Sequence, residues 1–258
     1  MSTKYADIRY QVAVGSHMLA DFGLASGVRA SLGHVSMRDP KDPTKFAVKG
    51  RGYRLDTLAR MRPEDLVVCD LDANLVEAQP NVVPCFEVKI HSCIYKARPD
   101  VQSVVHVHPR FTTVMSVIGK QIRSMCNEGN SLVMDPLPVY PKQKIVTTDA
   151  EGTLLADILG AGRAALLFGH GAVTAGHDME QSVTDMIHLE WQAEMNYYAY
   201  TMAGPDHGYV SREMVMEFAQ SSGSQYTLPH FKQAIEFAGM PEYNGVWGAW
   251  FEDASAKI

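Results

Sequence analysis

The sequence predicts a single α/β domain built on a mixed or antiparallel sheet, and three observations lead to this prediction. The chain has 258 residues, of which 46% are hydrophobic and 20% are charged, an ordinary globular composition. Short apolar or alternating segments typical of strands are interleaved with segments of helical spacing. Neighbouring strand-like segments are close enough in sequence to form hairpins, so the sheet is not expected to be purely parallel.

The first half of the chain is expected to contain a long helix, a hairpin, a further strand and a second helix. Apolar spacing predicts the opening helix over residues 5–28. Residues 33–48 are predicted to form a hairpin, because a turn with two prolines, Asp39-Pro-Lys-Asp-Pro43, separates two strand-like runs. The apolar run at 66–70 is typical of a buried strand, and the spacing over 84–97 predicts a helix.

The second half is expected to begin with a strand and to end in a separate extension. The predicted elements are a strand at 103–108, helices at 109–118 and 149–159, strands at 164–168 and 173–176, and a long helix at 179–203. A loop-rich stretch is expected between 118 and 147. Residues 206–258 are rich in aromatic side chains. We expect them to form helices and loops that pack on the main domain, residues 1–205, or on a neighbouring subunit.

Composition and charge argue against several classes of partner. The formal net charge is -6 and the pI is about 5.9, without the concentrated basic face of a nucleic-acid-binding protein. No apolar run approaches the ~20 residues that a membrane helix needs. Four cysteines without CxxC spacing predict reduced, mostly buried thiols in a cytoplasmic protein. They are Cys69, Cys85, Cys93 and Cys126.

Two histidines on one predicted strand point to a metal centre. His106 and His108 are two residues apart, so their side chains project from the same face of the strand. His170 follows another apolar run and lies between two glycines, which allow the backbone to approach a ligand closely. As a third ligand it would complete a three-histidine site with open positions, as catalysis requires. Hydrogen-bonded structural histidines are the alternative.

Glu87 is the candidate acid or base. It lies on the helix predicted just before the histidine strand, and its apolar neighbours indicate that this helix is partly buried. A buried carboxyl group near a metal is expected to have a raised pKa and to exchange protons with a substrate. A solvated surface glutamate is the alternative. His91, one turn later, could hydrogen-bond to Glu87 or lie on the helix surface.

The run Gly160-Ala-Gly162-Arg-Ala-Ala165 matches the glycine and alanine positions of a dinucleotide-binding fingerprint. That fingerprint requires a strand before it and a helix after it. Here the predicted order is reversed, so the glycines are expected to end a helix, and we expect no nucleotide cofactor.

Four motifs together resemble the class II aldolase and adducin family over roughly residues 8–203. They are Gly33-His-Val-Ser36, Glu87-Val-Lys-Ile-His91-Ser-Cys-Ile-Tyr-Lys-Ala-Arg-Pro-Asp100, Val105-His-Val-His-Pro109 and Leu167-Phe-Gly-His-Gly171-Ala-Val-Thr-Ala-Gly176. The resemblance implies a three-layer α/β/α sandwich with a mostly antiparallel central sheet. It also implies a homotetramer with sites near the subunit interfaces.

The resemblance assigns roles to four residues. His106, His108 and His170 are implied to be ligands of one divalent metal ion per subunit, and Glu87 is implied to be the acid/base. Three neutral imidazoles accept Zn2+, Mn2+, Fe2+ or Co2+, so the sequence does not select among these ions. Adducin-like members of the family often lack the glutamate, so its presence favours an active enzyme acting on a small molecule.

The chain departs from the sugar-phosphate aldolases of the family where those enzymes cradle a phosphate. His34 replaces an asparagine, and Cys85-Phe86 replaces two serines. Where the aldolases carry a Thr-Pro-Ser/Thr-Gly-like turn, this chain has Lys49-Gly50-Arg51-Gly52. The tyrosine that donates a proton in the aldolases has no counterpart in residues 125–128. The replacements therefore favour a different substrate.

These replacements suit a flat aromatic carboxylate. Arg51 offers a planar fork for a carboxylate, and His34 can add a second donor. Phe86 provides an apolar surface for a ring, and Ser36 is a further candidate for substrate contact. The pattern resembles a decarboxylase branch of the family that acts on hydroxy-substituted aromatic or heteroaromatic dicarboxylates.

We therefore predict a metal-dependent carbon–carbon lyase, and specifically a decarboxylase of a hydroxylated aromatic or heteroaromatic carboxylate. Three alternatives stay open. They are an aldolase for a non-phosphorylated hydroxy-keto substrate, a non-heme iron oxygenase on the same fold, and a non-catalytic adducin-like binding module.

Overall fold

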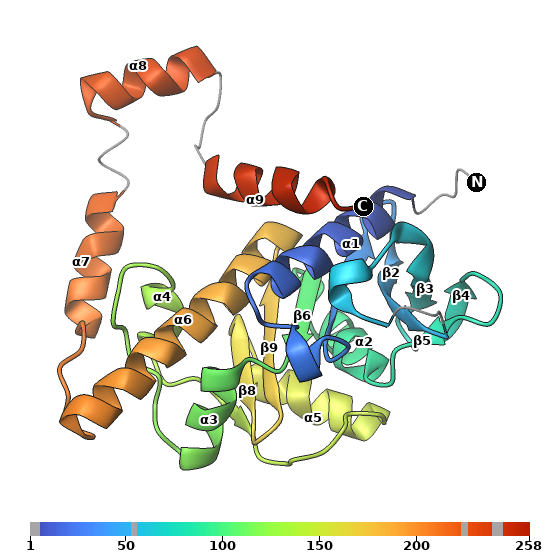
Figure 1. The fold of residues 1–258 in the computed structure, drawn as a ribbon, viewed down its shortest axis with the longest axis horizontal. Coiled ribbons are helices and arrows are strands. Elements are labelled where there is room, and N and C mark those ends of the chain that lie inside the picture. The colour runs from blue at the N-terminus through green and yellow to red at the C-terminus, as the bar shows by residue number, and fades with distance from the viewer. Residues whose placement is uncertain (1–5, 53–55, 223–226, 239–244) are drawn as a thin grey trace.

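A mostly antiparallel sheet forms the middle layer of the molecule (Figure 1). The computed structural model describes residues 6–52, 56–222, 227–238 and 245–258. Within these residues the sheet has the order β4-β3-β2-β1-β6-β9-β8-β7, with β5 paired to β2, and only β7 and β8 are parallel. The strands are β1 (His34–Asp39), β2 (Asp42–Arg51), β3 (Leu66–Asp70), β4 (Leu75–Glu77), β5 (Val83–Pro84), β6 (Ser103–Val107), β7 (Val139–Tyr140), β8 (Ala164–Leu167) and β9 (Gly171–Gly176).

Helices cover both faces of the sheet, each over its own apolar core. Helices α1 (Ala6–Asp21) and α6 (Met179–Ala203) pack on one face, where α3 (Arg110–Ile118) joins α6. Helices α2 (Val88–Ala97) and α5 (Asp149–Leu159) pack together on the other face. Strands such as β6 are buried on both sides, which explains their continuous apolar runs. The expected three-layer α/β/α sandwich is confirmed.

The register of three central strands decides which side chains meet. In the β1–β6 pair, His34 lies directly opposite His106. In the β6–β9 pair, Val107 lies opposite Ala172, two residues beyond His170. Cross-strand neighbours on one face are within side-chain reach. The middle of the sheet therefore gathers histidines that are distant in sequence.

Two predicted helices have different boundaries in the structure. The opening helix ends at Asp21, not at residue 28, because Gly23 adopts a φ of 75° and the Leu24 N–H donates to the Leu19 carbonyl, a Schellman-type stop. Its predicted first residue, Tyr5, lies outside the described residues. The helix predicted over 84–97 begins only at Val88, so Glu87 is its N-cap residue and does not lie within the helix. The changed boundary places Glu87 at the N-terminus of α2, where its carboxylate faces the histidines at the end of β6.

Most of the remaining predicted elements are confirmed within a residue or two, but the hairpin predicted over 33–48 continues to Arg51, because β2 stays paired with β3 and β5 beyond Val48. The stretch predicted as loop contains short elements as well. These are α4 (Asn130–Val133) and β7, which, like β4 and β5, were not predicted from the sequence. They are short, from two to four residues, and carry little periodic signal. The predicted order around Gly160 and Gly162 is confirmed: helix α5 comes before them and strand β8 after them.

The C-terminal segment contains α7 (Arg212–Ser222), α8 (Pro229–Ala238) and α9 (Gly245–Ser255). Figure 1 shows this segment leaving the sandwich through α7 and returning through α9, with α8 standing apart. Helix α9 packs on α1, and the ring of Trp250 contacts that of Phe22 at a centroid distance of 4.6 Å. None of the described helices combines the length and apolar character needed to cross a membrane. The cysteines are free thiols, three of them buried and Cys126 partly exposed.

Candidate metal centre and acid/base site

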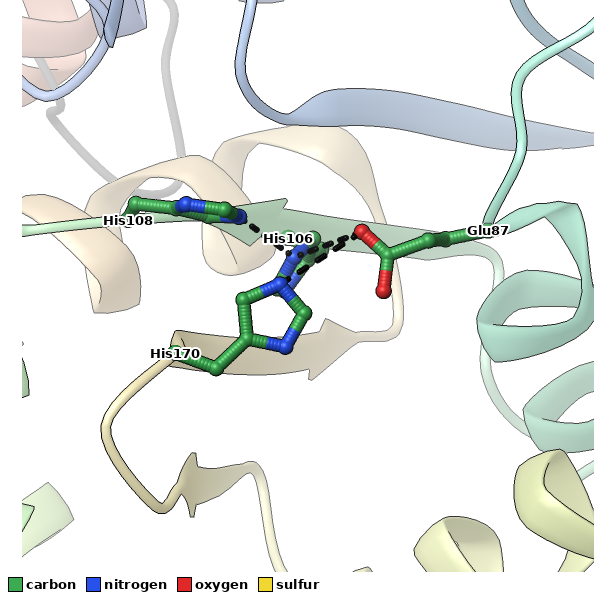
Figure 2. Close-up of side chains that lie close together, drawn as sticks. All are labelled: Glu87, His106, His108 and His170. Carbon is green, nitrogen blue, oxygen red and sulfur yellow. Dashed lines mark hydrogen bonds and ion pairs between the residues drawn. The ribbon is translucent and has the colours of Figure 1, made fainter. Parts of the chain in front are cut away.

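Four side chains from three parts of the fold converge at one end of β6 (Figure 2). His106 and His108 come from this strand and its end, and His170 comes from the connection between β8 and β9. Glu87 reaches in from the N-terminus of α2. Each residue offers one ligand atom, and these atoms all lie within 4.8 Å of one another. The structure therefore brings together the four residues that were assigned from the sequence to the metal and to proton transfer.

The spacing of the donor atoms fits a metal ion. The Nε2 atoms of His106 and His108 are 3.2 Å apart, and Oε2 of Glu87 lies 3.4 Å from Nε2 of His106 and 3.6 Å from Nε2 of His170. Two ligands bound at ~2.0–2.1 Å with tetrahedral geometry are separated by about 3.3 Å. Imidazole nitrogens and a carboxylate oxygen are also a chemically suitable donor set for Zn2+, Mn2+, Fe2+ or Co2+. Both the distances between the donor atoms and the types of ligand are therefore suitable for a divalent metal ion.

A backbone contact orients the central histidine. Nδ1 of His106 lies 2.9 Å from the carbonyl oxygen of Ala172 on the neighbouring strand, and a carbonyl can only accept. Nδ1 therefore carries the proton, and the lone pair of Nε2 is left for a ligand, as in many histidine–metal sites. His106 is fully buried, whereas His108 and His170 are partly exposed, so the centre opens toward these two residues.

The glycine after His170 allows β9 to approach β6. A Cβ atom on Gly171 would collide with the carbonyl oxygen of Val107, so glycine is required for this close contact between backbones. Gly169, on the other side, has a φ of 62°, which also favours glycine. The two glycines were expected to let the backbone approach a ligand. The structure instead shows Gly171 against the backbone of β6 and Gly169 in a turn, and the approach to a ligand stays a prediction.

The two oxygens of Glu87 have different environments. The backbone N–H of Val146 donates to Oε1 at 3.0 Å, and Oε2 faces the histidines. Burial by itself would raise the pKa of Glu87, but His106, His170 and the Val146 N–H outweigh it and hold the pKa well below its usual range. The expectation of a raised pKa is therefore wrong. Glu87 rests as a carboxylate, the form that accepts a proton.

Two of the three histidines, His108 and His170, are held in the neutral form in this site. Burial lowers the pKa of His108 to about 3, with repulsion from His106 and His170 adding to the effect. Burial also lowers the pKa of His170, again with a contribution from His106. Neutral imidazole is the form that binds metals.

His34 borders the same space from β1. Its ring centroid lies 5.1 Å from that of His106, and its Nε2 lies 3.9 Å from Oε2 of Glu87. Its other nitrogen, Nδ1, lies 2.6 Å from Nε2 of His91. His91 is fully buried and hydrogen-bonds to His34 and Ser36, so both expectations for it, a bond to Glu87 and a place on the surface, are wrong.

Ser36 is also fully buried. Its hydroxyl oxygen lies 2.6 Å from Nδ1 of His91 and 2.7 Å from the hydroxyl of Tyr95. The structure thus places Ser36 behind His34 and His91, and direct substrate contact by Ser36 stays a prediction.

Arg51 contacts Phe86, the residue before Glu87 in the chain. The guanidinium carbon of Arg51 lies 4.7 Å from the centroid of the Phe86 ring, and Phe86 is 65% exposed, beside Glu87 in the chain. Arg51 also pairs with Asp56 at 2.6 Å, while the buried Lys49 contacts the other oxygen of the same carboxylate at 2.7 Å. Two cations share one anion, so this corner keeps a net positive charge. Tyr53 and Arg54, which follow Gly52 in the chain, lie outside the described residues.

Three residues of this neighbourhood were not identified from the sequence. Val146 lies in the stretch predicted as loop, and its contribution is a backbone N–H, which no side-chain pattern reveals. Asp56 likewise has no sequence signal. Tyr95 is four residues after His91, so helical spacing places both on one face of α2, and this signal could have linked them.

Comparison with known proteins identifies the family. Residues 11–197 match the family model described as the class II aldolase and adducin N-terminal domain. The chain is 28% identical over 207 residues to the 3,4-dihydroxyphthalate decarboxylase of Arthrobacter keyseri, covering 78% of this chain and 82% of the relative. It is 26% identical over 250 residues to the protein of the same name from Terrabacter sp. strain DBF63, covering 94% and 92%.

A solved structure supports the fold. An aldolase II superfamily protein from Pseudomonas syringae superposes with a TM-score of 0.77 at 18% identity, covering 99% of this chain and 95% of that one. At this identity the likeness concerns the fold alone. The family model, in contrast, spans most of the sandwich and includes Glu87, His106, His108 and His170. The chain therefore belongs to the class II aldolase and adducin family.

Proposed function

We propose that this protein is a metal-dependent carboxy-lyase that removes CO2 from a hydroxylated aromatic or heteroaromatic carboxylate. The observation that carries the proposal is the convergence of Oε2 of Glu87 with three imidazole nitrogens, next to the positively charged corner of Lys49, Arg51 and Asp56. The names of the two decarboxylase relatives support the choice of reaction. A hydroxyl group beside the carboxylate would allow the substrate to chelate the metal.

His106, His108 and His170 would hold the ion, in one site per subunit. A divalent ion at this position would withdraw electron density from the substrate oxygens as the bond to the carboxylate breaks. We leave the choice among Zn2+, Mn2+, Fe2+ and Co2+ to elemental analysis, because all four accept this donor set.

Glu87 would move the proton. As a carboxylate it would accept the proton of the substrate hydroxyl through Oε2, while the Val146 N–H holds Oε1 in place. The bond between the ring carbon and the departing carboxylate then breaks, its electron pair stays on the ring, and CO2 leaves. Glu87 then returns its proton to that ring carbon. The same residue is base in one half of the reaction and acid in the other.

The border residues would orient the substrate. Arg51 would bind a second carboxylate or a hydroxyl, and Phe86 would lie against the ring. His34 would donate from Nε2 into the space beside Oε2 of Glu87. Asp56 keeps the guanidinium of Arg51 in place without cancelling the charge of the corner, because Lys49 shares the same carboxylate.

We also propose a cytoplasmic homotetramer with its sites near the subunit interfaces. The free thiols support the compartment. The exposed apolar side chains of the C-terminal segment support an association between copies, and Met214, Phe218 and Phe231 are examples. Light scattering after size-exclusion chromatography would measure the mass, and a monomer would contradict this assembly.

The test combines metal analysis with a screen for released CO2. The purified protein is analysed by mass spectrometry for bound metals, and is then incubated with that metal and hydroxyaromatic acids, beginning with 3,4-dihydroxyphthalate. CO2 release in air and under nitrogen alike supports the proposal. Formation of an aldehyde with a ketone or ketoacid, without CO2, would identify an aldolase, and turnover that needs O2 with Fe2+ would identify an oxygenase. Absence of both bound metal and any turnover would favour a binding module.

A further inference from the structure

A buried chain of hydrogen bonds leads from Tyr95 to His34, at the border of the site. It begins at Tyr95, whose hydroxyl lies 2.7 Å from the hydroxyl of Ser36. Ser36 is 2.6 Å from Nδ1 of His91, and Nε2 of His91 is 2.6 Å from Nδ1 of His34. The last atom of the chain, Nε2 of His34, faces Oε2 of Glu87 at 3.9 Å. No more than 5% of any of the four chain residues is exposed.

This series of hydrogen bonds forms because β1 and α2 present polar side chains to each other at similar intervals. His34 and Ser36 are two residues apart on β1 and share one face of the strand, at a spacing of about 6.8 Å. His91 and Tyr95 are four residues apart on α2 and share one face of the helix, at a rise of about 6 Å. The two pairs therefore meet in alternation, and each polar atom finds a partner.

Each link in the chain needs one hydrogen. Burial lowers the pKa of His91 to about 3, with a contribution from His106. His91 is therefore neutral and carries one N–H, and its contact with His34 needs one N–H and one lone pair. The direction of a single link then determines which nitrogen of His34 bears the hydrogen.

The carboxylate of Glu87 determines that direction. If Tyr95 donates to Ser36, Ser36 to His91 and His91 to His34, then Nε2 of His34 keeps its hydrogen and presents it toward Oε2 of Glu87. In the opposite direction Nε2 would present a lone pair to a buried carboxylate oxygen, which is electrostatically unfavourable. The first arrangement therefore has the lower free energy.

We propose that His91, itself held by Ser36 and Tyr95, is a positioning residue that keeps His34 in the Nε2–H form, so that His34 donates to a substrate oxygen beside Glu87. Ser36 thereby acts through His91 and not by contact with the substrate. The part of this inference that concerns the substrate rests on the proposed function, whereas the hydrogen arrangement does not.

Nitrogen-15 NMR of the full-length protein with labelled histidine tests the hydrogen arrangement directly. The sample contains added Zn2+ and no chelator. Two-bond correlations distinguish a protonated ring nitrogen from an unprotonated one, and spectra of His34→Gln and His91→Gln assign the two rings. We expect His34 and His91 both to be protonated at Nε2 and unprotonated at Nδ1. A hydrogen on Nδ1 of His34 in the assigned wild-type spectrum would overturn the proposal.

Substitution of Ser36 or Tyr95 should change how often each ring nitrogen of His34 carries the hydrogen. In Ser36→Ala and Tyr95→Phe we expect the His34 signals to move toward an average of the two forms. His17 is the internal control, since its Nε2 contacts the Met61 carbonyl in a separate part of the core, and its signals should not change. Unchanged His34 signals in folded Ser36→Ala would show that the chain does not control this ring.

Kinetics test the consequence for the substrate. Ser36→Ala and Tyr95→Phe should keep the metal content and lower kcat/KM by about tenfold, the effect of losing one hydrogen bond to the substrate. His91→Gln, whose amide N–H can replace the donor at Nε2, should retain more activity than His91→Asn. Equal losses in the glutamine and asparagine variants would assign His91 a purely structural role. If no substrate is turned over, the proposed function fails while the NMR result still decides the hydrogen arrangement.

Discussion

The backbone N–H of Val146 donates to Oε1 of Glu87 at 3.0 Å, and this bond leaves Oε2 directed at the histidine cluster. One oxygen of the carboxylate is therefore held by the protein, and the other is available for chemistry. Val146 belongs to the connection between β7 and α5, while Glu87 caps α2 on the same face of the sheet. The orientation of the acid/base group thus depends on a segment almost sixty residues away in sequence.

Replacement of Glu87 by glutamine should abolish proton transfer and leave the metal bound. The amide keeps an oxygen for the Val146 N–H but cannot accept a proton, so we expect kcat to fall by about 10²–10⁴-fold. Metal content, measured by mass spectrometry, should stay near that of the wild type because three histidines remain. Glu64→Gln, at an exposed position, is the matched control and should leave kcat unchanged. Full activity of Glu87→Gln would exclude the assigned role.

Loss of one histidine ligand should remove the metal and the stability that it provides. A ligand present at 100 times its Kd stabilises a folded protein by about 2.7 kcal/mol. We therefore expect a chelator to lower the Tm of the wild type and to have little effect on His108→Ala. His177→Ala removes an exposed histidine outside the cluster and should behave like the wild type. A metal content near one per chain in His108→Ala would contradict the three-histidine site.

Arg51 should affect substrate binding more than the chemical step. In Arg51→Gln, Asp56 keeps its contact with Lys49, so the local fold is expected to survive while one donor fork to the substrate is lost. A charge-assisted hydrogen bond contributes about 1.5–3 kcal/mol, so KM should rise by about 10- to 100-fold with a small change in kcat. Initial-rate kinetics measure both constants, and Arg62→Gln at an exposed position is the control. An unchanged KM would place the substrate carboxylate elsewhere.

Asp185 should make the protein less stable as the pH rises. Burial raises the pKa of its carboxyl from 3.8 to about 6, although Arg163 at 3.4 Å opposes the effect. Below pH 3.8 the group is neutral in both the folded and the unfolded chain, and from there up to about pH 6 only the unfolded chain loses its proton readily. The free energy of unfolding therefore falls across this range, by an amount of about 3 kcal/mol.

Asp185→Asn removes this dependence. The variant should gain stability over the wild type as the pH rises from about 4 to 6, and the difference should then stay constant. Urea unfolding at a series of pH values measures it, with exposed Asp157→Asn as the control. A variant that is less stable than the wild type at pH 8 would show that the contact with Arg163 outweighs the cost of burial.

The sequence determined the local elements and the chemical types at the site. Period and composition predicted most long helices and strands, and the spacing of His106 and His108 was enough to place both rings on one face of a strand. The local elements and the faces of a strand depend on residues close together in the chain, so they can be predicted from the sequence alone.

Boundaries and partners depended on the tertiary structure. Glu87 was predicted inside a helix with a raised pKa, and the fold makes it an N-cap residue whose carboxyl has a lowered pKa. His91 was predicted to contact Glu87 or solvent, and the packing of α2 on β1 connects it to Ser36 and His34 instead. A pKa and a hydrogen-bond partner follow from distances of a few ångströms between distant segments.

There is a physical reason why some features of the site follow from the sequence and others only from the tertiary structure. The sequence by itself determined that this chain carries three histidines and a carboxylate suited to a metal centre, because ligand chemistry and strand periodicity are local properties. Only the tertiary structure decided that Val146 holds Glu87, that His34 lies opposite His106, and that Ser36 lies behind the site. These relationships arise from strand register and from the packing of helices on the sheet, which bring together residues that no local pattern connects.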